Sequence, residues 1–340
     1  MRHVLIGGDG FVGRQLARLL FDRGDSVVVA DVHRGDDGRD GGVPFVAIDI
    51  TDKSTLPALD LGPDDVVYNL AAVMLAPIPP RRRRYAAYMP VNFHGVHHLL
   101  DHALERGCRK IVHFSTDMVY GPTVTVPQTE DHPIGPFGWY GLSKLASEML
   151  CVEYRAHGLD ITIFRPRLII GPGRLGILEK LFRLVDLNLP VPMIGRGHVP
   201  YQFISVFDCA SAALAAADQG CPNRVYNLGS VDPPPVRELL GRLVDEANSR
   251  SILLPTPAPL VKWALGTLDG LNLPLMDPEQ YMIADEHCEL DVGRAERELG
   301  WAPTYRDDDM LLAAYRTYRD GRQTARPPAA AAPDRGAQPR

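Results

Sequence analysis

A tyrosine and a lysine four residues apart, Tyr140 and Lys144, are the residues of this chain best suited to proton transfer. They stand at the start of a helical pattern in the segment WYGLSK, so their side chains share one face of the predicted helix. A lysine ammonium beside a phenol stabilises the phenolate and lowers its pKa from about 10 toward the working range. Tyr140 can therefore act as acid or base toward a substrate hydroxyl or carbonyl.

A glycine-rich turn near the N-terminus predicts a dinucleotide site. Gly7, Gly10 and Gly13 have GxxGxxG spacing within GGDGFVG, between a strand pattern and a helix pattern. Glycine allows the tight turn, the close approach of a pyrophosphate to the backbone, and the packing of helix on strand. The first helical turn, which contains Phe11 and Val12, then directs unpaired N–H groups at the phosphates.

Asp31 ends the second predicted strand, where a side chain can select between the two nicotinamide cofactors. A carboxylate there accepts hydrogen bonds from the adenosine ribose and repels a 2′-phosphate, so NAD is favoured over NADP. Arg34 follows closely and weakens this preference. Lys144 is also expected to hold the nicotinamide ribose.

Segments at other strand ends complete the expected cofactor site. Asp49 and Ile50 follow the third strand and are expected to meet the adenine ring; an ordinary acidic loop is the alternative. The segment NLAA ends the fourth strand with small residues, where a cofactor passes close to the backbone. The residues expected to contact the cofactor are Gly7, Gly10, Phe11, Val12, Gly13, Asp31, Asp49, Ile50, Leu70, Ala71, Ala72, Asn92, Tyr140, Lys144 and Arg167.

Alternating strands and helices must position these residues. Strand patterns cover residues 2–8, 26–31, 43–50, 65–72, 110–116 and 160–166, and helix patterns cover 11–24, 91–107 and 139–158. This alternation predicts an α/β fold with a Rossmann-type, doubly wound parallel sheet.

In the second half of the chain, strand and helix patterns alternate less regularly. Residues 1–172 are expected to form mainly the NAD-binding domain. Residues 173–320, in which prolines crowd at 190–200, 222–235 and 255–278, are expected to form mainly a smaller substrate-binding lobe. Returns to the sheet, such as RVYNLG, interrupt that lobe. The Pro-, Ala- and Arg-rich residues 321–340 are expected to be disordered.

Composition narrows the range of partners. The 340 residues carry a formal net charge of -6, which gives no indication of a nucleic-acid partner. The five cysteines are scattered with no CxxC pair, which argues against a metal site or disulfides and fits a reducing compartment. No signal peptide precedes the first strand, and no apolar run approaches the ~20 residues of a membrane span. We therefore expect a cytoplasmic homodimer that acts on a small molecule and has no membrane partner.

Taken together, the segments resemble the extended short-chain dehydrogenase/reductases of the NAD-dependent epimerase/dehydratase type. The resemblance rests on GGDGFVG, Asp31, NLAA, Asn92, STDMVYG, YGLSK, FRPRLIIGPG, FISVFDCASAAL and ELGWAP, which span residues 4 to about 303. It implies that Thr116 polarises the substrate oxygen beside Tyr140, with Ser115 as the fallback. It also implies that Asn92 braces the site from within its helix; an ordinary polar residue on a helix face is the alternative.

Met118 departs from one branch of this family. In the sugar 4,6-dehydratases the segment resembles STDEVYG, where the Asp protonates the leaving hydroxyl and the Glu removes the C5 proton. Here Asp117 remains, but Met118 replaces the glutamate, and a thioether has no proton to exchange. Elimination is therefore disfavoured, and hydride transfer at one carbon is favoured. Asp117 then hydrogen-bonds the substrate or caps a local turn.

Further departures bear on the substrate. Leu168 stands where nucleotide-sugar members carry an Asn for the diphosphate, and Tyr201 and Gln202 stand where they carry an Arg. The apolar stretch LLPTPAPLVKWALGTLDGLNLPLMDP resembles the hydroxysteroid-dehydrogenase and ketoreductase-like branches instead. The run Arg81–Arg84 follows NLAA and either binds an anionic group or, as is slightly favoured, forms a solvated loop.

Three functions are consistent with these observations. The first is an NAD-dependent epimerase or oxidoreductase that transfers hydride at a sugar-like secondary alcohol of a nucleotide sugar. The second is a dehydrogenase or ketoreductase of a more apolar alcohol or ketone without a nucleotide. The third, least favoured because Thr116, Tyr140 and Lys144 are all present, is an NAD-binding regulator without turnover. The fold hosts many chemistries, so the sequence does not name the substrate.

Overall fold

The computed structural model describes residues 1–35, 42–75, 77–173, 176 and 178–324. At its centre lies a seven-stranded sheet in the order β10-β6-β5-β4-β1-β2-β3, and every adjacent pair is parallel. The strands are β1 (Arg2–Ile6), β2 (Ser26–Asp31), β3 (Phe45–Ala47), β4 (Asp65–Asn69), β5 (Lys110–Phe114), β6 (Asp160–Pro166) and β10 (Val225–Leu228). The strand order reverses between β1 and β4, as in a doubly wound sheet. The predicted α/β, Rossmann-type fold class is confirmed.

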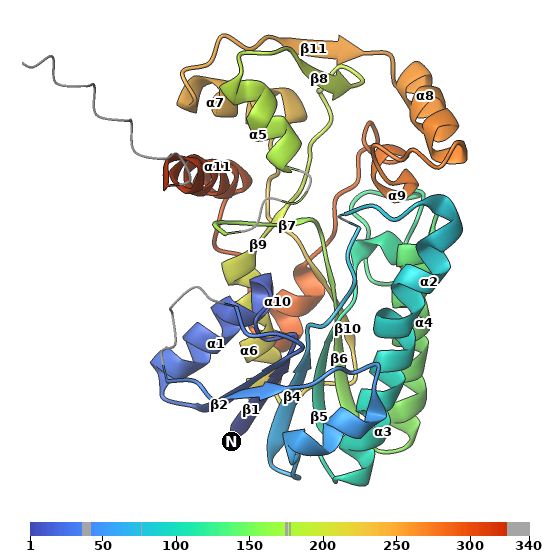
Figure 1. The fold of residues 1–340 in the computed structure, drawn as a ribbon, viewed down its shortest axis with the longest axis vertical. Coiled ribbons are helices and arrows are strands. Elements are labelled where there is room, and N and C mark those ends of the chain that lie inside the picture. The colour runs from blue at the N-terminus through green and yellow to red at the C-terminus, as the bar shows by residue number, and fades with distance from the viewer. Residues whose placement is uncertain (36–41, 76, 174–175, 177, 325–340) are drawn as a thin grey trace, which may run out of the picture.

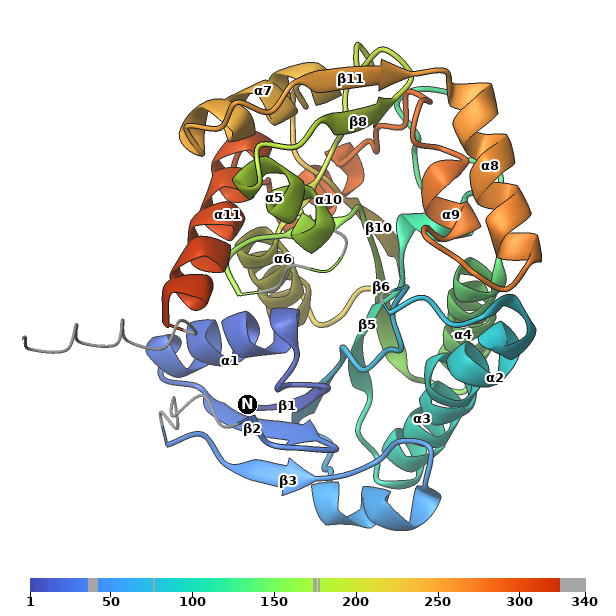
Figure 2. The ribbon, with the colours of Figure 1, turned by 45° about the horizontal axis from the view of Figure 1, so that its top comes forward.

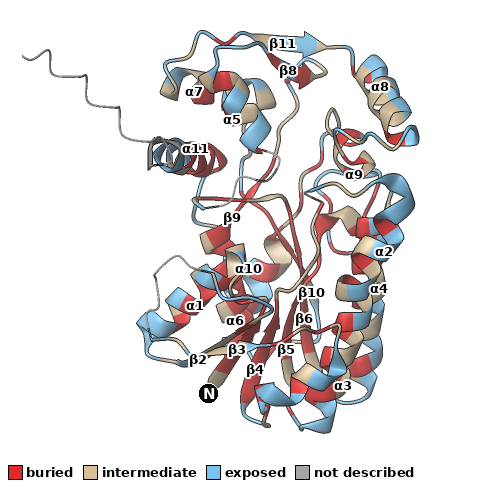
Figure 3. Cartoon of the chain, viewed as in Figure 1, coloured by how far each residue is buried: buried red, intermediate tan, exposed pale blue. Residues whose placement is uncertain are grey.

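Helices cover both faces of this sheet (Figure 1). One face carries α1 (Phe11–Arg23), α6 (Val206–Asp218) and α10 (Gly293–Leu299), and the other carries α2 (Arg84–Met89), α3 (Val96–Glu105) and α4 (Trp139–Ala156). Successive side chains of β1 divide between the two layers: Leu5 packs with α1 and α6, whereas Val4 and Ile6 pack with α3 and α4. Because both faces are covered, the central strands β1, β4, β5 and β6 are almost wholly buried, whereas β2 and β3, toward one edge of the sheet, are partly exposed (Figure 3).

A second group of elements stands beyond the carboxyl ends of the strands (Figure 2). It consists of β7 (Ile169–Ile170), α5 (Leu178–Asp186), β8 (Val191–Ile194), β9 (Ile204–Ser205), α7 (Val236–Glu246), β11 (Leu253–Thr256), α8 (Ala258–Gly270), α9 (Pro278–Tyr281) and α11 (Asp307–Thr324). Phe182, Leu243 and Tyr315 are among the residues of its own apolar core. Helix α11 continues beyond residue 320, where the tail was expected to begin, and residues 325–340 lie outside the described residues.

Local signals explain where two helices begin and end. Helix α1 stops at Gly24, whose φ of +84° lets its N–H donate to the carbonyl groups of Leu20 and Phe21. The helix expected over residues 91–107 instead begins with a π-helical turn, Pro90–Gly95, before α3 starts. Gly95 allows close packing there, since a Cβ atom on it would lie 2.6 Å from Ile50 Cγ1. Short π-helical segments of this kind are frequent at functional sites.

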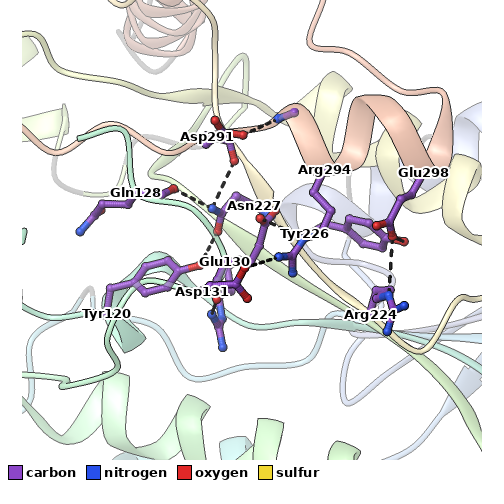
Figure 4. A network of polar contacts seen from close by, with 12 residues as sticks. Tyr120, Gln128, Glu130, Asp131, Arg224, Tyr226, Asn227, Asp291, Arg294 and Glu298 are labelled. Atoms are coloured by element: carbon purple, nitrogen blue, oxygen red, sulfur yellow. Dashed lines mark hydrogen bonds and ion pairs between the residues drawn. The ribbon is translucent and has the colours of Figure 1, made fainter. Parts of the chain in front are cut away.

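A polar network fastens the segment after β5 to β10 and α10 (Figure 4). The Tyr120 hydroxyl donates to Asn227 Oδ1 at 2.6 Å, and the Asn227 N–H donates to Glu130 Oε1 at 2.9 Å. Arg294 of α10 forms ion pairs with Glu130 at 3.3 Å and with Asp131 at 2.9 Å. This network holds the chain that immediately follows the STDMVYG segment.

In the part of the chain that the structure describes, no helix combines the length and apolar character that crossing a bilayer requires. Within the same residues, no group of three or more His, Cys, Asp or Glu side chains is placed to hold a metal ion.

Candidate active site

A cavity of about 520 Å³ lies at the carboxyl ends of the strands, where the strand order reverses. Seventeen of the eighteen residues predicted from the sequence line it: Gly7, Gly10, Phe11, Val12, Gly13, Asp31, Asp49, Ile50, Leu70, Ala71, Ala72, Ser115, Thr116, Asp117, Tyr140, Lys144 and Arg167. Residues from six different strand ends and from two helices, α1 and α4, therefore meet in one place.

The glycine turn at the start of α1 is shaped to let a ligand approach the backbone. Gly7 has a φ of +73°, and a Cβ atom on it would lie 2.6 Å from the backbone nitrogen of Ala71. A Cβ atom on Gly13 would lie 2.5 Å from the carbonyl oxygen of Gly8. Gly10 caps α1 without a side-chain hydrogen bond, so the first-turn N–H groups remain for a ligand. This cradle fits a pyrophosphate.

Asp31 is held in one orientation at the end of β2. Its Oδ1 accepts the N–H of Val32 at 2.8 Å, and its Oδ2 accepts the N–H of Asp9 at 3.1 Å. Arg34, which could have favoured a 2′-phosphate, has its guanidinium over the Phe45 ring, 5.6 Å from the centroid. The described lining of the cavity includes Asp31 and excludes Arg34. Of these two charged groups, the carboxylate of Asp31 is thus the one that lines the cavity.

Asp49 makes local contacts, whereas Asn92 links distant segments. Asp49 Oδ1 accepts the N–H and the hydroxyl of Thr51 at 2.8 and 2.7 Å, which closes a turn beside the cavity. Asn92 is fully buried behind the cavity wall and does not line it. Its amide bonds both backbone groups of Val73, at 2.8 and 3.1 Å, and donates to the Ser143 hydroxyl at 3.0 Å. Asn92 therefore joins the segment after β4 to α4, rather than contacting a cofactor as expected.

Helix α4 carries both Tyr140 and Lys144 to the end of β5. The Tyr140 hydroxyl lies 3.6 Å from the sulfur of Met74, inside the cavity. Lys144 is buried, and its ammonium donates to the carbonyl oxygen of Phe114, the last residue of β5. Burial lowers the pKa of Lys144 to about 8, against the opposing charge of Glu148. The lysine can therefore exchange a proton near neutral pH.

A buried histidine fixes the position of this helix. His113 of β5 bonds Asn69 at 3.1 Å through Nδ1 and Ser147 at 3.0 Å through Nε2. The Ser147 hydroxyl donates to the carbonyl of Lys144 at 2.7 Å, so His113 Nε2 must donate to Ser147. Burial lowers the pKa of His113 well below its ordinary value, which keeps the ring neutral. The chain of hydrogen bonds ties α4 to the strand beneath it.

Asp117 is engaged by protein groups through both carboxylate oxygens. Its Oδ1 accepts the Thr116 hydroxyl at 3.1 Å, and its Oδ2 accepts a guanidinium N–H of Arg167. Arg167 is buried as well, and its guanidinium lies 5.4 Å from the centre of the Tyr201 ring. A charge-assisted bond to a buried arginine holds the carboxylate in place, so both oxygens of Asp117 are engaged inside the protein. The expectation that Asp117 simply caps a turn misses this ion pair.

Ser115 differs from its neighbours in having no internal partner. Its Oγ is buried and forms no hydrogen bond with any described residue, although it lines the cavity. A buried hydroxyl without a partner is costly unless a ligand or water satisfies it. Ser115 is thus placed to contact a bound molecule.

The arginine run after NLAA is solvated in its first three residues, as the favoured alternative predicts, but Arg84 departs from both alternatives. Arg81, Arg82 and Arg83 are exposed, but Arg84 is buried. Arg84 forms a bidentate ion pair with Asp269 of α8 and lies 3.5 Å from Asp277. The last arginine of the run therefore neither faces a substrate nor lies in solvent, because two buried carboxylates of the lobe neutralise it.

Glu279 is the main residue that the sequence analysis missed. Both carboxylate oxygens accept the N–H of Gly141, at 2.9 and 3.1 Å, in the first turn of α4 beside Tyr140. Burial raises the pKa of Glu279 to about 8. The sequence does contain a helix-start signal here, since Asp277 caps α9 and Pro278 follows it. Nothing in that signal indicates that Glu279 would meet a different helix.

The fold and the cavity define a class: a dinucleotide-binding α/β protein with a Tyr–Lys pair for proton transfer. The profile of the NAD dependent epimerase/dehydratase family matches residues 3–229, so the chain belongs to that enzyme family. The family predicted from the sequence segments is confirmed.

Similar proteins cover nearly the whole chain. The uncharacterized protein y4nG of Sinorhizobium fredii is 30% identical over 321 residues, which are 94% of this chain and 79% of that protein. A dTDP-glucose 4,6-dehydratase of Streptomyces antibioticus is 28% identical over 362 residues, with complete coverage of both chains. The structure of a UDP-glucose 4-epimerase from Thermotoga maritima superposes with a TM-score of 0.76 at 23% identity, and covers 94% of this chain and 99% of that one. At that identity the structural likeness shows a shared fold.

Proposed function

We propose that this protein is an NAD-dependent epimerase or oxidoreductase that transfers hydride at a secondary alcohol of a sugar-like substrate, specifically a nucleotide sugar. The observation that carries the proposal is the convergence of Thr116, Tyr140 and Lys144 with the glycine turn in one cavity. The names of the relatives, a dTDP-glucose dehydratase and a UDP-glucose epimerase, support a nucleotide sugar.

The site residues divide the proton chemistry among them. Bound NAD would supply the hydride acceptor, with its pyrophosphate on the turn at Gly10 and its adenosine ribose at Asp31. Tyr140 removes the proton of the substrate hydroxyl and returns one when a carbonyl is reduced. Lys144, held by the carbonyl of Phe114, favours the phenolate through its charge. Thr116 orients the substrate oxygen, while Asp117 orients Thr116.

The surroundings of Asp117 support hydride transfer without loss of water. Elimination from a hexose needs an acid for the leaving hydroxyl and a base for the neighbouring carbon. Asp117 is committed to Arg167 and Thr116, and Met118 lines the cavity where a base would stand. Similarity to 4,6-dehydratases therefore does not extend to the groups that elimination requires.

A second candidate substrate, an apolar alcohol or ketone without a nucleotide, is favoured by one wall of the cavity. Met74, Leu75, Leu168 and Leu178 line that wall. Gln202, where an arginine was expected in nucleotide-sugar enzymes, is buried and donates to the carbonyls of Ser230 and Leu290 at 2.7 and 3.2 Å. Its amide is therefore used inside the protein.

We also propose a cytoplasmic homodimer. Leu104 of α3 and Leu142, Met149 and Val152 of α4 are exposed on the outer surface of the helical layer, and such a set suits a contact between two copies. The cysteines, all free and buried, suit a reducing compartment. Sedimentation of the wild type and of Met149→Glu tests the dimer.

The fate of a deuterium label on the substrate carbon tests the proposed hydride transfer. The protein is incubated with NAD and, in separate reactions, UDP-glucose, dTDP-glucose, UDP-glucuronate, and a hydroxysteroid, each deuterated at the carbinol carbon. A nucleotide sugar should give an epimer or a ketone with the label on the reduced cofactor or returned to carbon. Turnover of the hydroxysteroid alone favours the second candidate. No reaction with any alcohol, together with NAD binding, supports the regulator instead. Tyr140→Phe serves as the inactive control.

A further inference from the structure

Helix α8 exposes apolar side chains that no part of the described structure covers. Only Ala258 and Asp269 of its thirteen residues are buried, and these two lie on one face, three turns apart. Leu260 and Trp263 project from the opposite face, and Trp263 is 69% exposed. Both charged residues of α8 are neutralised, Lys262 by Asp285 and Asp269 by Arg84. The outer face of α8 therefore carries no unpaired charge and is apolar at Leu260 and Trp263.

The loop after α8 extends this apolar surface. Leu271, Leu273 and Leu275 are each more than half exposed. Leucines at alternate positions of one short loop, next to an exposed tryptophan, form an apolar patch of the kind that marks an interaction site. We call Leu260, Trp263, Leu271, Leu273 and Leu275 the α8 patch. Figure 3 shows the helix and this loop with little buried surface.

Three arginines stand next to the α8 patch. Arg81, Arg82 and Arg83 are exposed, and none forms an ion pair with any residue that the structure describes. Arg84, the next residue, is bound to Asp269, which lies two residues before Leu271. The ion pair therefore places the arginines at the C-terminal end of α8, and the start of α2 lies below that end in Figures 1 and 2. The protein as a whole is acidic, with a net charge of -6, so this positive cluster is local.

We propose that the α8 patch and Arg81–Arg83 form a docking surface for an anionic lipid bilayer. Exposed tryptophan and leucine side chains enter the boundary between headgroups and acyl chains, and neighbouring arginines bind anionic headgroups. The positive charge of Arg81–Arg83 favours a bilayer over a second copy of the chain. In a dimer formed through this surface, the arginines of one copy would face the α8 patch of the other, and that patch has no acidic group to pair with them. Such docking places the protein on the membrane surface, which needs no spanning helix.

Docking would bring the lobe side of the cavity close to the membrane. Gln280 of α9, five residues after Leu275, lines the cavity. Met74 and Leu75, which precede the arginine run, line it too. Two short segments, from Leu275 to Gln280 and from Leu75 to Arg81, therefore connect the docking surface to the cavity. A protein bound to the membrane through this surface would hold its cavity near the lipid headgroups.

Vesicle binding by the full-length protein tests the proposal. Sedimentation with phosphatidylcholine vesicles is compared with sedimentation with vesicles that contain phosphatidylglycerol. Binding is expected only to the anionic vesicles and should weaken at high salt. The variant Arg81→Gln/Arg82→Gln/Arg83→Gln should lose binding on the order of a hundredfold, given the attraction of each arginine to an anionic surface. Trp263→Glu/Leu271→Glu should lose binding on the order of tenfold or more.

A matched control variant and a probe of insertion depth distinguish specific docking from non-specific adsorption to vesicles. Phe21 is exposed on α1, away from α8 in Figure 1, and Phe21→Glu should leave vesicle binding unchanged. Lipids brominated in the acyl chain should quench the fluorescence of the wild type, and Trp263→Phe should remove most of this quenching. Equal binding to neutral and anionic vesicles, or unchanged binding of both patch variants, would overturn the proposal. So would a dimer that dissociates in Trp263→Glu/Leu271→Glu, because the patch would then be covered by a second copy.

Discussion

The two walls of the cavity are built differently. The wall at the sheet has apolar side chains too, but it carries the polar groups: the turn at Gly7, the carboxylate of Asp31, and Lys144 on the carbonyl of Phe114. The wall toward the lobe is largely apolar, with Leu168 and Leu178 in it. The first wall can hold a cofactor and move protons, whereas the second can only select by shape and polarity. We therefore expect the chemistry of this protein to be set at the sheet and its choice of substrate to be set by the lobe.

The lobe is attached to α2 and α4 through a few buried ionisable groups. Arg84 pairs with Asp269 and Asp277, and Glu279 binds the first turn of α4. At the sheet, the same helix is held by an apolar core and by the His113 hydrogen bonds. Substitutions on the two sides should therefore have separable effects on chemistry and on stability.

Tyr140→Phe should show the largest effect on the sheet side. Losing the proton-transfer oxygen should lower turnover by about 10²–10⁴ and leave the affinity for NAD unchanged. Steady-state kinetics and calorimetry measure the two quantities. Lys144→Met should reduce both turnover and NAD affinity, since we expect Lys144 to hold the nicotinamide ribose as well. Turnover retained in Tyr140→Phe would contradict its assignment.

Arg84→Met tests the attachment of the lobe. It leaves Asp269 and Asp277 buried without their positive partner, which should cost about 3–5 kcal/mol in the free energy of unfolding. Chemical denaturation measures this cost. Lys262→Met breaks the more exposed pair with Asp285 and should cost about 1 kcal/mol or less. Equal losses in the two variants would mean that the buried pair does not carry the attachment.

Glu279→Gln should reveal a pH dependence on the lobe side. Burial raises the pKa of Glu279 from 4.5 to about 8, so the folded protein retains a proton that the unfolded chain releases. The contribution of this group to stability is present at low pH, falls as the pH rises from about 4.5 to about 8, and changes little beyond that.

The glutamine variant keeps an acceptor for Gly141 but does not titrate. The variant should therefore gain stability relative to the wild type as the pH rises. The difference in free energy of unfolding, variant minus wild type, should be greater at about pH 8.5 than at about pH 5, by up to a few kcal/mol, and melting temperatures measured at the two pH values should show it. A difference that is the same at both pH values would show that Glu279 titrates normally.

Asp31→Ala should have the smallest effect. It removes the negative charge that opposes a 2′-phosphate, so the preference for NAD over NADP should narrow by about tenfold. Calorimetry with each cofactor measures the ratio. Tighter binding of NADP than NAD by the wild type would show that Arg34 outweighs Asp31.

Much of the sheet side could be predicted from the sequence because its signals are local. The glycines of α1, the end of β2 at Asp31 and the Tyr140–Lys144 spacing each depend on a few adjacent residues. Their meeting in one cavity follows from the parallel sheet, which brings all strand ends to one edge.

The lobe side could not be predicted because its contacts join distant segments. Arg84 and Asp269 are 185 residues apart, and Gly141 and Glu279 are 138 residues apart. No spacing or periodicity indicates such pairs. The contacts of Asn92 were missed for the same reason. The family pattern identified the residue, but its bond to Val73 depends on the π-helical turn in which it lies.

We expect hydride transfer here without elimination, and the mass of the product tests this most directly. The protein is incubated with NAD and either dTDP-glucose or UDP-glucose, and the products are analysed by mass spectrometry. Because Met118 cannot take a proton and Asp117 is held by Arg167, the product should be an epimer of unchanged mass or a ketone that has lost two hydrogens. A product that has lost one water would contradict the account, since another group would then have to serve as the base.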